Sequence, residues 1–466
     1  MQKNKTKDII VVGFALFAIF FGAGNLIFPP YLGILAGGEW AKSAIGFLIT
    51  DPVFPVIGVI ATAMVGGMAD DLGKRVSHKF SVLIGTVSIL TIGPFFAVPR
   101  TAATTHEVFT VQIFGDGTIE SVPAWITSVI FFAITLILVI NPTKVIDIIG
   151  KFLTPILIII LVGTIIVAIF NPAGEIAPEA PGAVNGMLGE QSLFLKGFTE
   201  GYQTMDALGA ALMSGIVVTD LINKGYTEEK EQFKAACGVG LVAAILLAIV
   251  YGGLTYVGAT LSSIPEFANE MLPADNRTGI LVGLFTTMFG AAGKWAIGIA
   301  VALACLTTSI GLTGTAGNFF TRIFHKEDDD KFYKIIVTVC VVIAFLLSLF
   351  GVAKLIFFAV PILASIYPIY MTLFVVTLFD KWIKYNWTYT GAVIAVAIVS
   401  IPKGIFQYCA MNEIAAPGFL ESYIGLLNKI PLASLDFNWI IPAIVGMILF
   451  TAISAIAKVG KTRDDM

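Results

Sequence analysis

Charged residues are scarce in this sequence. Asp, Glu, Lys and Arg together make up 13% of its 466 residues, whereas 57% of the residues are hydrophobic. A soluble domain carries about 25% charged residues, so the composition excludes a soluble globular chain and indicates a membrane protein that contacts a lipid bilayer. The formal net charge is −3 and the basic residues are scattered, so we expect no nucleic-acid partner.

Histidine and cysteine are scarce as well, and no pair of them has the spacing of a metal site. The chain contains three histidines and four cysteines: His78, His106, His325, Cys237, Cys305, Cys340 and Cys409. The cysteines stand alone in apolar stretches, where we expect them to pack as small hydrophobic side chains. The sequence also lacks a phosphate-binding loop and a nucleophile elbow. We therefore predict no enzyme, no organic cofactor and no pump driven by ATP.

Long apolar runs, by contrast, fill most of the chain. A membrane-spanning helix needs about 20 apolar residues, and on this basis the sequence predicts an all-α membrane protein with twelve transmembrane helices. The predicted spans cover residues 9–29, 41–67, 80–104, 123–140, 147–170, 192–219, 234–259, 295–322, 333–350, 355–379, 388–406 and 438–457. The apolar segment 278–292 is shorter, and we expect it to be a helix that caps the outer side before span eight.

The basic residues predict the orientation of these spans. Most of the 28 lysines and arginines precede span one or follow even-numbered spans, as Lys74, Arg75 and Lys79 do after span two. The opposite loops carry acids such as Glu175 and Glu266. Because cytoplasmic loops are enriched in Lys and Arg, we expect both termini in the cytoplasm. The first apolar run continues without a cleavage site, so we interpret it as a retained span of a multi-pass protein.

Span one is interrupted in its outer half, between Phe20 and Pro30. The run includes Gly22, Gly24 and Asn25, followed by the pair Pro29-Pro30. Glycine in a helix interior costs about 1 kcal/mol relative to alanine, and proline cannot continue a helix far. In a bilayer such a break is tolerated only where the freed backbone groups face protein, water or a ligand. We therefore predict a broken helix, with close helix packing through small residues as the alternative for the two glycines.

Span six is interrupted in a similar way, five spans later. Its segment 196–209 is too polar for a lipid-facing helix; Gly197 and Gly201 loosen it, and Asp206 lies near mid-depth. Corresponding broken segments in two halves of a chain indicate the midplane site of a secondary transporter. We therefore predict one transporter domain, 1–466, made of two inverted five-helix repeats and two additional helices. The repeats would cover residues 9–170 and 192–379, and the additional helices 388–457.

The two breaks together predict a site for a zwitterionic amino acid. Half-helix N-termini present N–H groups to anions, so the carboxylate is expected on the segment Gly22-Ala23-Gly24-Asn25. Unwound carbonyls suit cations, so the ammonium group is expected near Tyr202 and Thr204. Asp206 could hold the ammonium group, help bind a cation or carry a proton, with an N-cap of the second half-helix as the alternative.

Other polar and aromatic residues of the spans have more local alternatives. Asp51 precedes Pro52, so a cap at a helix kink is favoured over a substrate role. Arg100 lies near the outer end of span three and is interpreted as an outer gate or an interfacial anchor. Phe95 and Phe96 could wall an apolar substrate pocket, although aromatic residues in spans more often pack against other helices.

Span eight carries adjacent hydroxyl groups on Thr307, Thr308 and Ser309. Hard cations take oxygen ligands, so these hydroxyls could bind Na⁺ together with carbonyls from a broken helix. Ser and Thr in spans more often bond to their own helix or join two helices. The hydroxyls are candidates for a cation site only because span one is also broken and its free carbonyls could complete the set of oxygen ligands.

The run from Phe20 to Pro30 resembles the hallmark of the bacterial branched-chain amino acid:cation symporters, the BrnQ or carrier system II family. The segment from Gly93 to Thr101 in span three and the run from Tyr202 to Asp206 in span six add to this resemblance, which extends over essentially the whole chain. The resemblance implies a protein of the bacterial plasma membrane that takes up leucine, isoleucine and valine with Na⁺, or with H⁺ in some members.

More distantly, the break in span one resembles amino acid transporters of the leucine-transporter fold, which have inverted five-helix repeats and two extra helices. The Na⁺ ligands that this implies are backbone carbonyls of span one and hydroxyls of span eight: Ala18, Phe21, Thr308 and Ser309, with Thr307 as a further candidate. Phe28 is a departure, because sodium symporters of that fold have an arginine outer gate at this position. Gating by charge at Phe28 is therefore not expected.

Three functions follow from these observations. The first is a secondary importer of branched-chain amino acids driven by Na⁺, with H⁺ as the alternative coupling ion. The second is a passive channel or amino acid sensor of the same fold, and the third is a carrier for another solute. The sequence does not indicate an oligomeric state.

Overall fold

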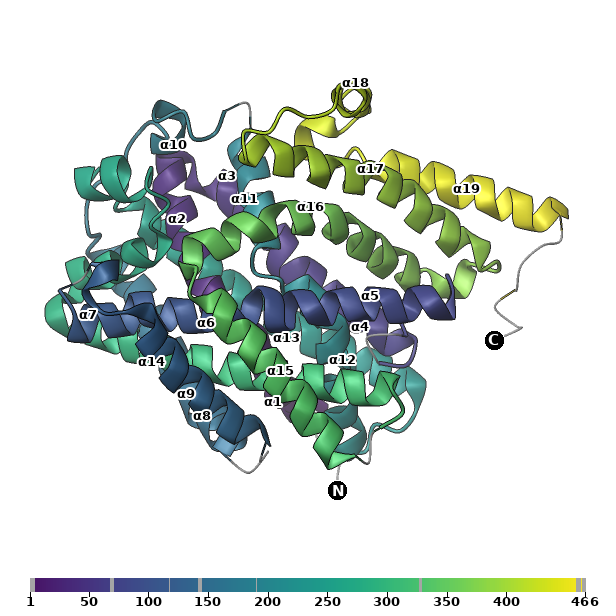
Figure 1. The fold of residues 1–466 in the computed structure, drawn as a ribbon, viewed down its shortest axis with the longest axis horizontal. Coiled ribbons are helices and arrows are strands. Elements are labelled where there is room, and N and C mark those ends of the chain that lie inside the picture. The colour runs from purple at the N-terminus through teal and green to yellow at the C-terminus, as the bar shows by residue number, and fades with distance from the viewer. Residues whose placement is uncertain are drawn as a thin grey trace.

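The computed structural model describes residues 5–67, 71–116, 118–140, 145–189, 191–326, 329–457 and 462, and their regular structure is helical throughout (Figure 1). Within these residues nine helical stretches are long and apolar enough to cross a membrane. Three further apolar helices are shorter: Ala124–Ile140, Ile158–Phe170 and Gly418–Leu427. The all-α membrane fold is confirmed, whereas the count of twelve spans and the division into repeats stay predictions.

The helices follow the predicted order of the spans. Spans one to five correspond to α1 (Lys5–Phe20) with α2 (Ala23–Ala36), α3 (Trp40–Leu48) with α4 (Phe54–Met64), α5 (His78–Leu90) with α6 (Ala97–Thr105) and α7 (Val111–Phe114), α8 (Ala124–Ile140), and α9 (Val145–Phe170). Spans six to ten correspond to α11 (Leu193–Tyr202) with α12 (Asp206–Asn223), α13 (Glu229–Ala259), α14 (Arg277–Ile323), α15 (Asp330–Ser348) and α16 (Gly351–Leu378). The last two correspond to α17 (Trp387–Met411) and α19 (Ile440–Ala457). The short helices α10 (Pro181–Val184) and α18 (Gly418–Leu427) were not predicted.

Spans two and three are interrupted as well, which the sequence prediction missed. Non-helical backbone occurs at Asp51 (φ −146°, ψ 110°) and at Gly93 (φ −83°, ψ −112°). Each of these residues precedes a proline, Pro52 or Pro94, and proline has no N–H group with which to continue the helical hydrogen bonds. Four of the predicted spans therefore contain backbone that leaves the regular helical path.

The predicted outer cap and span eight are two helical parts of α14 that join at a kink. The helix α14 runs from Arg277 to Ile323 with a kink at Gly290, where φ is 61° and ψ is −147°. Glycine reaches this conformation without steric cost. The segment 277–289, which we call the lid segment, is therefore joined directly to the transmembrane part of α14.

Glycines bring helices from different parts of the chain into close contact. A Cβ atom at Gly197 of α11 would lie 2.0 Å from the backbone oxygen of Ser43, and one at Gly46 of α3 would lie 2.1 Å from that of Phe194. Small residues at such crossings let two backbones approach each other. Gly197 therefore allows α11 to pack against α3, which corrects the interpretation that it loosens the helix.

The C-terminal helices lie at one edge of the molecule. The helices α16, α17 and α19 run side by side there, with α18 beyond α17 (Figure 1). Gly391 and Gly446 allow the close crossing of α17 and α19, because a Cβ atom at Gly391 would lie 2.2 Å from the oxygen of Gly446.

Candidate functional site

The first break lies between α1 and α2. Gly22 is extended (φ −101°, ψ 173°) and has no side chain to cap α2. Its N–H donates to the oxygen of Phe20 over 2.9 Å, so the helical bond to the oxygen of Ala18 is not made. The break therefore releases the carbonyl of Ala18 at the negative end of α1 and places N–H groups at the positive end of α2. The side chain of Ala23 lies outside the part of the chain that the structure describes.

The second break lies between α11 and α12 and is built by a tight turn. Met205 has left-handed backbone (φ 65°), and the N–H groups of Gln203 and Met205 donate to the oxygens of Glu200 and Tyr202. The hydroxyl of Thr204 donates to the oxygen of Gly201 over 2.8 Å. Both predicted breaks are therefore present, and each exposes backbone groups of an interrupted helix.

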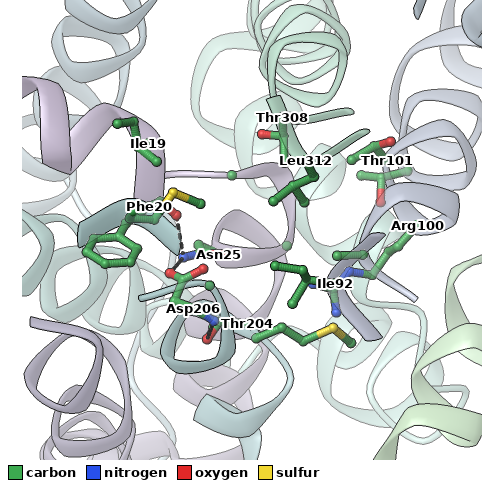
Figure 2. A pocket seen from close by; sticks show the side chains of 17 residues that line it. Ile19, Phe20, Asn25, Ile92, Arg100, Thr101, Thr204, Asp206, Thr308 and Leu312 are labelled. Carbon is green, nitrogen blue, oxygen red and sulfur yellow. Dashed lines mark hydrogen bonds between the residues drawn. The ribbon is translucent and has the colours of Figure 1, made fainter. Parts of the chain in front are cut away.

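Asn25 connects the two breaks. Its side chain is only 2% exposed, and its amide nitrogen lies 3.0 Å from the oxygen of Phe20 and 2.5 Å from Oδ2 of Asp206 (Figure 2). The same nitrogen lies 2.6 Å from the hydroxyl of Tyr251. Asn25 thus connects the end of α1 to the start of α12, and the hydroxyl of Tyr251 on α13 contacts the same amide nitrogen.

Asp51 belongs to the same cluster, which the sequence analysis did not favour. It is fully buried, its Oδ2 lies 3.3 Å from the amide nitrogen of Asn25, and its Oδ1 has no hydrogen-bond partner among the described residues. Asp51 and Asp206 therefore share one amide group. Two carboxylates this close repel each other unless a cation lies between or beside them, so the cluster can hold a proton, a metal cation or an ammonium group.

The breaks face a common cavity of about 50 Å³. Its polar walls include Asn25, Thr204, Asp206 and Thr308. Its apolar walls come from four spans: Ile19, Phe20, Ile92, Ala97, Met205, Met213 and Leu312. A single water needs only about 10–15 Å³ by a comparable measure, so this volume accommodates a few waters. An amino acid would enter only after side chains around the cavity move.

Arg100 lies in the wall of this cavity and not at the membrane interface. Its side chain is 5% exposed, and it donates to the backbone oxygen of Gln203 in the second break over 2.6 Å. A Cβ atom at Gly24 would lie 2.5 Å from one guanidinium nitrogen. The interpretation of Arg100 as an interfacial anchor is therefore wrong.

The three hydroxyls of span eight point in different directions. Thr308 lines the cavity, and its Oγ1 would lie 3.4 Å from a Cβ atom at Gly22. The hydroxyl of Thr307 donates to the oxygen of Ala304 on its own helix, and that of Ser309 lies 3.3 Å from Oγ1 of Thr135 on α8. The structure therefore brings Thr308 to the first break, whereas Ser309 faces α8.

Three of the predicted substrate residues lie elsewhere. Phe95 is 38% exposed, and neither Phe95 nor Phe96 lines the cavity. Tyr202 packs against Tyr367 with ring centroids 4.4 Å apart and lines a second, larger cavity of about 790 Å³. The turn from Gln203 to Met205 therefore separates the two cavities, because Gln203 lines the larger one and Met205 the smaller one.

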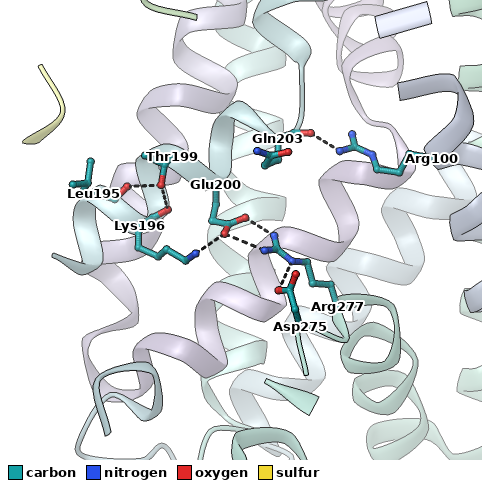
Figure 3. Close-up of polar contacts among 8 residues, drawn as sticks. All are labelled: Arg100, Leu195, Lys196, Thr199, Glu200, Gln203, Asp275 and Arg277. Atoms are coloured by element: carbon teal, nitrogen blue, oxygen red, sulfur yellow. Dashed lines mark hydrogen bonds and ion pairs between the residues drawn. The ribbon is translucent and has the colours of Figure 1, made fainter. Parts of the chain in front are cut away.

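A network of charged residues lies beside the larger cavity, on the side predicted to be outside. Arg277 of the lid segment forms a buried ion pair with Glu200 of α11 and a 2.9 Å pair with Asp275 (Figure 3). Lys196 reaches the same Glu200 over 2.9 Å. The sequence analysis missed this network, although an acidic residue such as Glu200 within an apolar span is itself a functional signal.

Phe28 lies between two arginines. The Cζ atom of Arg277 is 5.1 Å from the centre of its ring, and that of Arg100 is 5.5 Å away. These distances are typical of cation–π contacts. The ring of Phe28 therefore contacts cationic side chains from both α6 and α14.

A second ion pair lies near the ends of spans that are predicted to be cytoplasmic. Arg75 follows α4 and pairs with Asp380, which follows α16, over 2.5 Å. Arg75 also donates to Oδ1 of Asn386 over 2.8 Å and lies over the ring of Tyr389. The orientation prediction treated Arg75 only as a loop cation, whereas the structure buries it between two loops.

The fold and the two facing breaks define a multi-pass membrane transporter. The family profile described as "Branched-chain amino acid transport protein" matches residues 5–457, and the chain belongs to this family. The chain is 38% identical over 446 residues to "Branched-chain amino acid permease BraB" of Bacillus subtilis, covering 95% of this chain and 94% of the relative. It is 32% identical over 466 residues to "Branched-chain amino acid transport system 2 carrier protein" of Pseudomonas aeruginosa, covering 100% and 99%.

Solved structures confirm the leucine-transporter-like fold. A Na⁺-coupled sialic acid symporter, solved in a substrate-bound outward-open state, has a TM-score of 0.59 at 14% identity, covering 98% of this chain and 91% of the other. MhsT in complex with L-phenylalanine has a TM-score of 0.54 at 16% identity, covering 94% and 98%. The comparisons therefore place the chain among transporters and permeases rather than enzymes.

Proposed function

We propose that this protein is a secondary active symporter that imports leucine, isoleucine and valine together with Na⁺ by alternating access. The observation that carries the proposal is the meeting of the two broken helices at Asn25 and Asp206, beside a cavity with polar and apolar walls. The relatives named above as branched-chain amino acid permease and carrier support the choice of substrate. The protein would lie in the plasma membrane of a bacterium with both termini in the cytoplasm.

The cavity offers complementary groups for an amino acid. N–H groups at the start of α2, around Gly22, Ala23, Gly24 and Asn25, would receive the carboxylate. Thr204 and Asp206 lie across from them and would receive the ammonium group. Apolar walls read a branched side chain by shape, and such pockets separate ligands that differ by one methylene by only about 1–3 kcal/mol. The three branched-chain amino acids should therefore compete for transport.

The first break also fits a Na⁺ ion. The carbonyl of Ala18 is released at the end of α1, where the helix dipole is negative, and the hydroxyl of Thr308 faces the same break. Na⁺ takes oxygen ligands of this kind. We propose Ala18, Phe21 and Thr308 as the groups that would hold the ion, and Thr307 is a weaker candidate because its hydroxyl donates to Ala304 of its own helix. Ser309 is the weakest of the candidates because its hydroxyl faces Thr135.

The pair of buried carboxyl groups makes H⁺ the second candidate for the coupling ion. Asp51 and Asp206 share the amide of Asn25, and a proton on one of them would remove their mutual repulsion. A Na⁺ ion or the ammonium group of the substrate would have the same effect. The geometry is therefore compatible with Na⁺-coupled and with H⁺-coupled transport. The response of leucine uptake to an imposed Na⁺ gradient or pH gradient distinguishes the two.

Uptake of labelled leucine into proteoliposomes tests the proposal. An imposed inward Na⁺ gradient should drive accumulation above equilibrium, and unlabelled isoleucine and valine should reduce it. Accumulation that ignores the Na⁺ gradient but follows a pH gradient would support the H⁺ alternative. A passive channel would give no accumulation above equilibrium and no saturation, and competition by an unrelated solute alone would indicate a carrier for another substrate.

A further inference from the structure

Arg100 is a buried cation that faces the same cavity as the two broken helices. Its guanidinium lies directly beside the first break, since a Cβ atom at Gly24 would be 2.5 Å from Nη2. Its Nη1 donates to the oxygen of Gln203 in the second break. Figure 2 shows Arg100 on one side of the cavity and Asn25 with Asp206 on the other.

The charge of Arg100 is not neutralised by an ion pair. Arg75 and Arg277 are buried too, and each is paired with a carboxylate. In the described ranges, however, no carboxylate oxygen lies within the 4.0 Å of an ion pair from Arg100. The acid that lines the same cavity is Asp206, which is bonded to Asn25 across the cavity. An unpaired buried cation is costly, so the site is complementary to an anionic ligand group.

We propose that Arg100 binds the carboxylate of the transported amino acid, while the ammonium group of the amino acid lies toward Asp206. This inference rests on the proposed function and adds a specificity-determining residue to it. A guanidinium binds a carboxylate through two parallel hydrogen bonds. The backbone N–H groups of α2 would position the same carboxylate, and Arg100 would supply the opposite charge.

The surroundings of Arg100 hold its side chain ready for this role. The ring of Phe28 lies 5.5 Å from Cζ on one side, and the bond to Gln203 fixes one nitrogen. A side chain that is already ordered loses little freedom when the ligand binds. Gly24 is required at its position because any larger residue would displace the guanidinium from the break.

The test compares leucine with leucinol, which lacks the carboxylate, and with 4-methylpentanoate, which keeps the carboxylate but lacks the ammonium group. Purified full-length protein in saturating Na⁺ is titrated with leucine, leucinol or 4-methylpentanoate, and binding is measured as ligand-induced thermal stabilisation. The wild type should prefer leucine to leucinol. Arg100→Gln should weaken leucine binding by about 30-fold or more and leucinol binding by less than about threefold, so that the preference collapses. Arg100→Lys should keep part of it, and the exposed control Lys42→Gln should keep all of it.

Several outcomes would overturn the inference. An Arg100→Gln variant that retains the preference, or that loses leucine and leucinol equally, excludes a role in carboxylate binding. If Arg100→Gln does not fold, Gly24→Ala replaces it, because the added Cβ atom displaces the end of a flexible side chain; an unchanged preference there also overturns the inference. If leucine binding requires chloride and Arg100→Gln removes that requirement, the guanidinium holds an inorganic anion instead. A wild type that binds no branched-chain amino acid overturns the proposed function itself, before any variant is compared.

Discussion

The side-chain amide of Asn25 donates a 2.5 Å hydrogen bond to the carboxylate of Asp206, which lies 181 residues further along the chain. This bond joins the two interrupted helices at the point where each has unpaired backbone groups. The same amide lies within reach of Asp51 and Tyr251. One side chain therefore organises groups from four predicted spans around the cavity.

Replacing Asn25 by alanine should abolish most transport. The change leaves Asp51 and Asp206 without their shared donor, and a hydrogen bond to a charged group contributes about 1.5–3 kcal/mol. We expect the initial rate of leucine uptake per inserted protein in proteoliposomes to fall at least about tenfold. Asn318→Ala, which changes an exposed asparagine of α14, is the control. Uptake by Asn25→Ala close to that of the control would contradict the role of this residue.

Among the hydroxyls of span eight, Thr308 should matter most for the cation. It faces the first break, whereas the hydroxyl of Ser309 is paired with Thr135. Thr308→Ala should raise the Na⁺ concentration that gives half-maximal leucine binding by about tenfold, the effect of losing roughly 1.4 kcal/mol. Ser309→Ala should have a smaller effect on this concentration. The reverse order would show that the Na⁺ ion lies on the other side of α14.

The ion pair between Glu200 and Arg277 should stabilise the contact between α11 and the lid segment. Both side chains are buried, and removing one partner of a buried pair typically costs about 3–5 kcal/mol. Glu200→Gln should therefore lower the midpoint of thermal unfolding clearly. The double variant Glu200→Gln/Arg277→Gln should recover part of that loss, because the buried cation of Arg277 is then removed together with its partner. A loss in the double variant equal to the sum of the losses in Glu200→Gln and Arg277→Gln would exclude coupling between the two residues.

Gly197→Ala should destabilise the fold by interfering with the crossing of α3 and α11. The added Cβ atom would lie 2.0 Å from the backbone oxygen of Ser43, and overpacking of this kind costs about 1–3 kcal/mol. The thermal midpoint of the purified protein measures the effect. Gly425→Ala in α18 is a matched helical control, since nothing lies within 4 Å of its Cβ position. A midpoint like that of the control would show that the two helices can separate freely.

The first break was predictable because glycine and proline disfavour a continuous helix, and the second because the segment 196–209 is too polar for a lipid-facing helix. Their meeting at Asn25 and Asp206 was suggested by topology, but the contact itself depends on how distant helices pack. Asp51 was assigned to a local cap because Pro52 follows it. Its true environment comes from α2, α12 and α13, which no local pattern describes.

The three adjacent hydroxyls of span eight illustrate a related difficulty. Successive residues of an α-helix point about 100° apart, so Thr307, Thr308 and Ser309 cannot all face one site. The sequence shows that a hydroxyl of this run can face the site, but the rotation of the helix about its axis decides which residue supplies it. The contacts of Arg100 and Arg277 with the ring of Phe28 could not be predicted either, because the three residues lie on separate elements.

The kink at Gly290 divides α14 into two parts that make different contacts. Arg277, before the kink, contacts α11 and the ring of Phe28, whereas Thr308, beyond it, faces the first break. The lid segment and the part of α14 that carries Thr308 are therefore separate helical parts joined at Gly290. A change in the backbone at Gly290 would move the lid segment relative to Thr308.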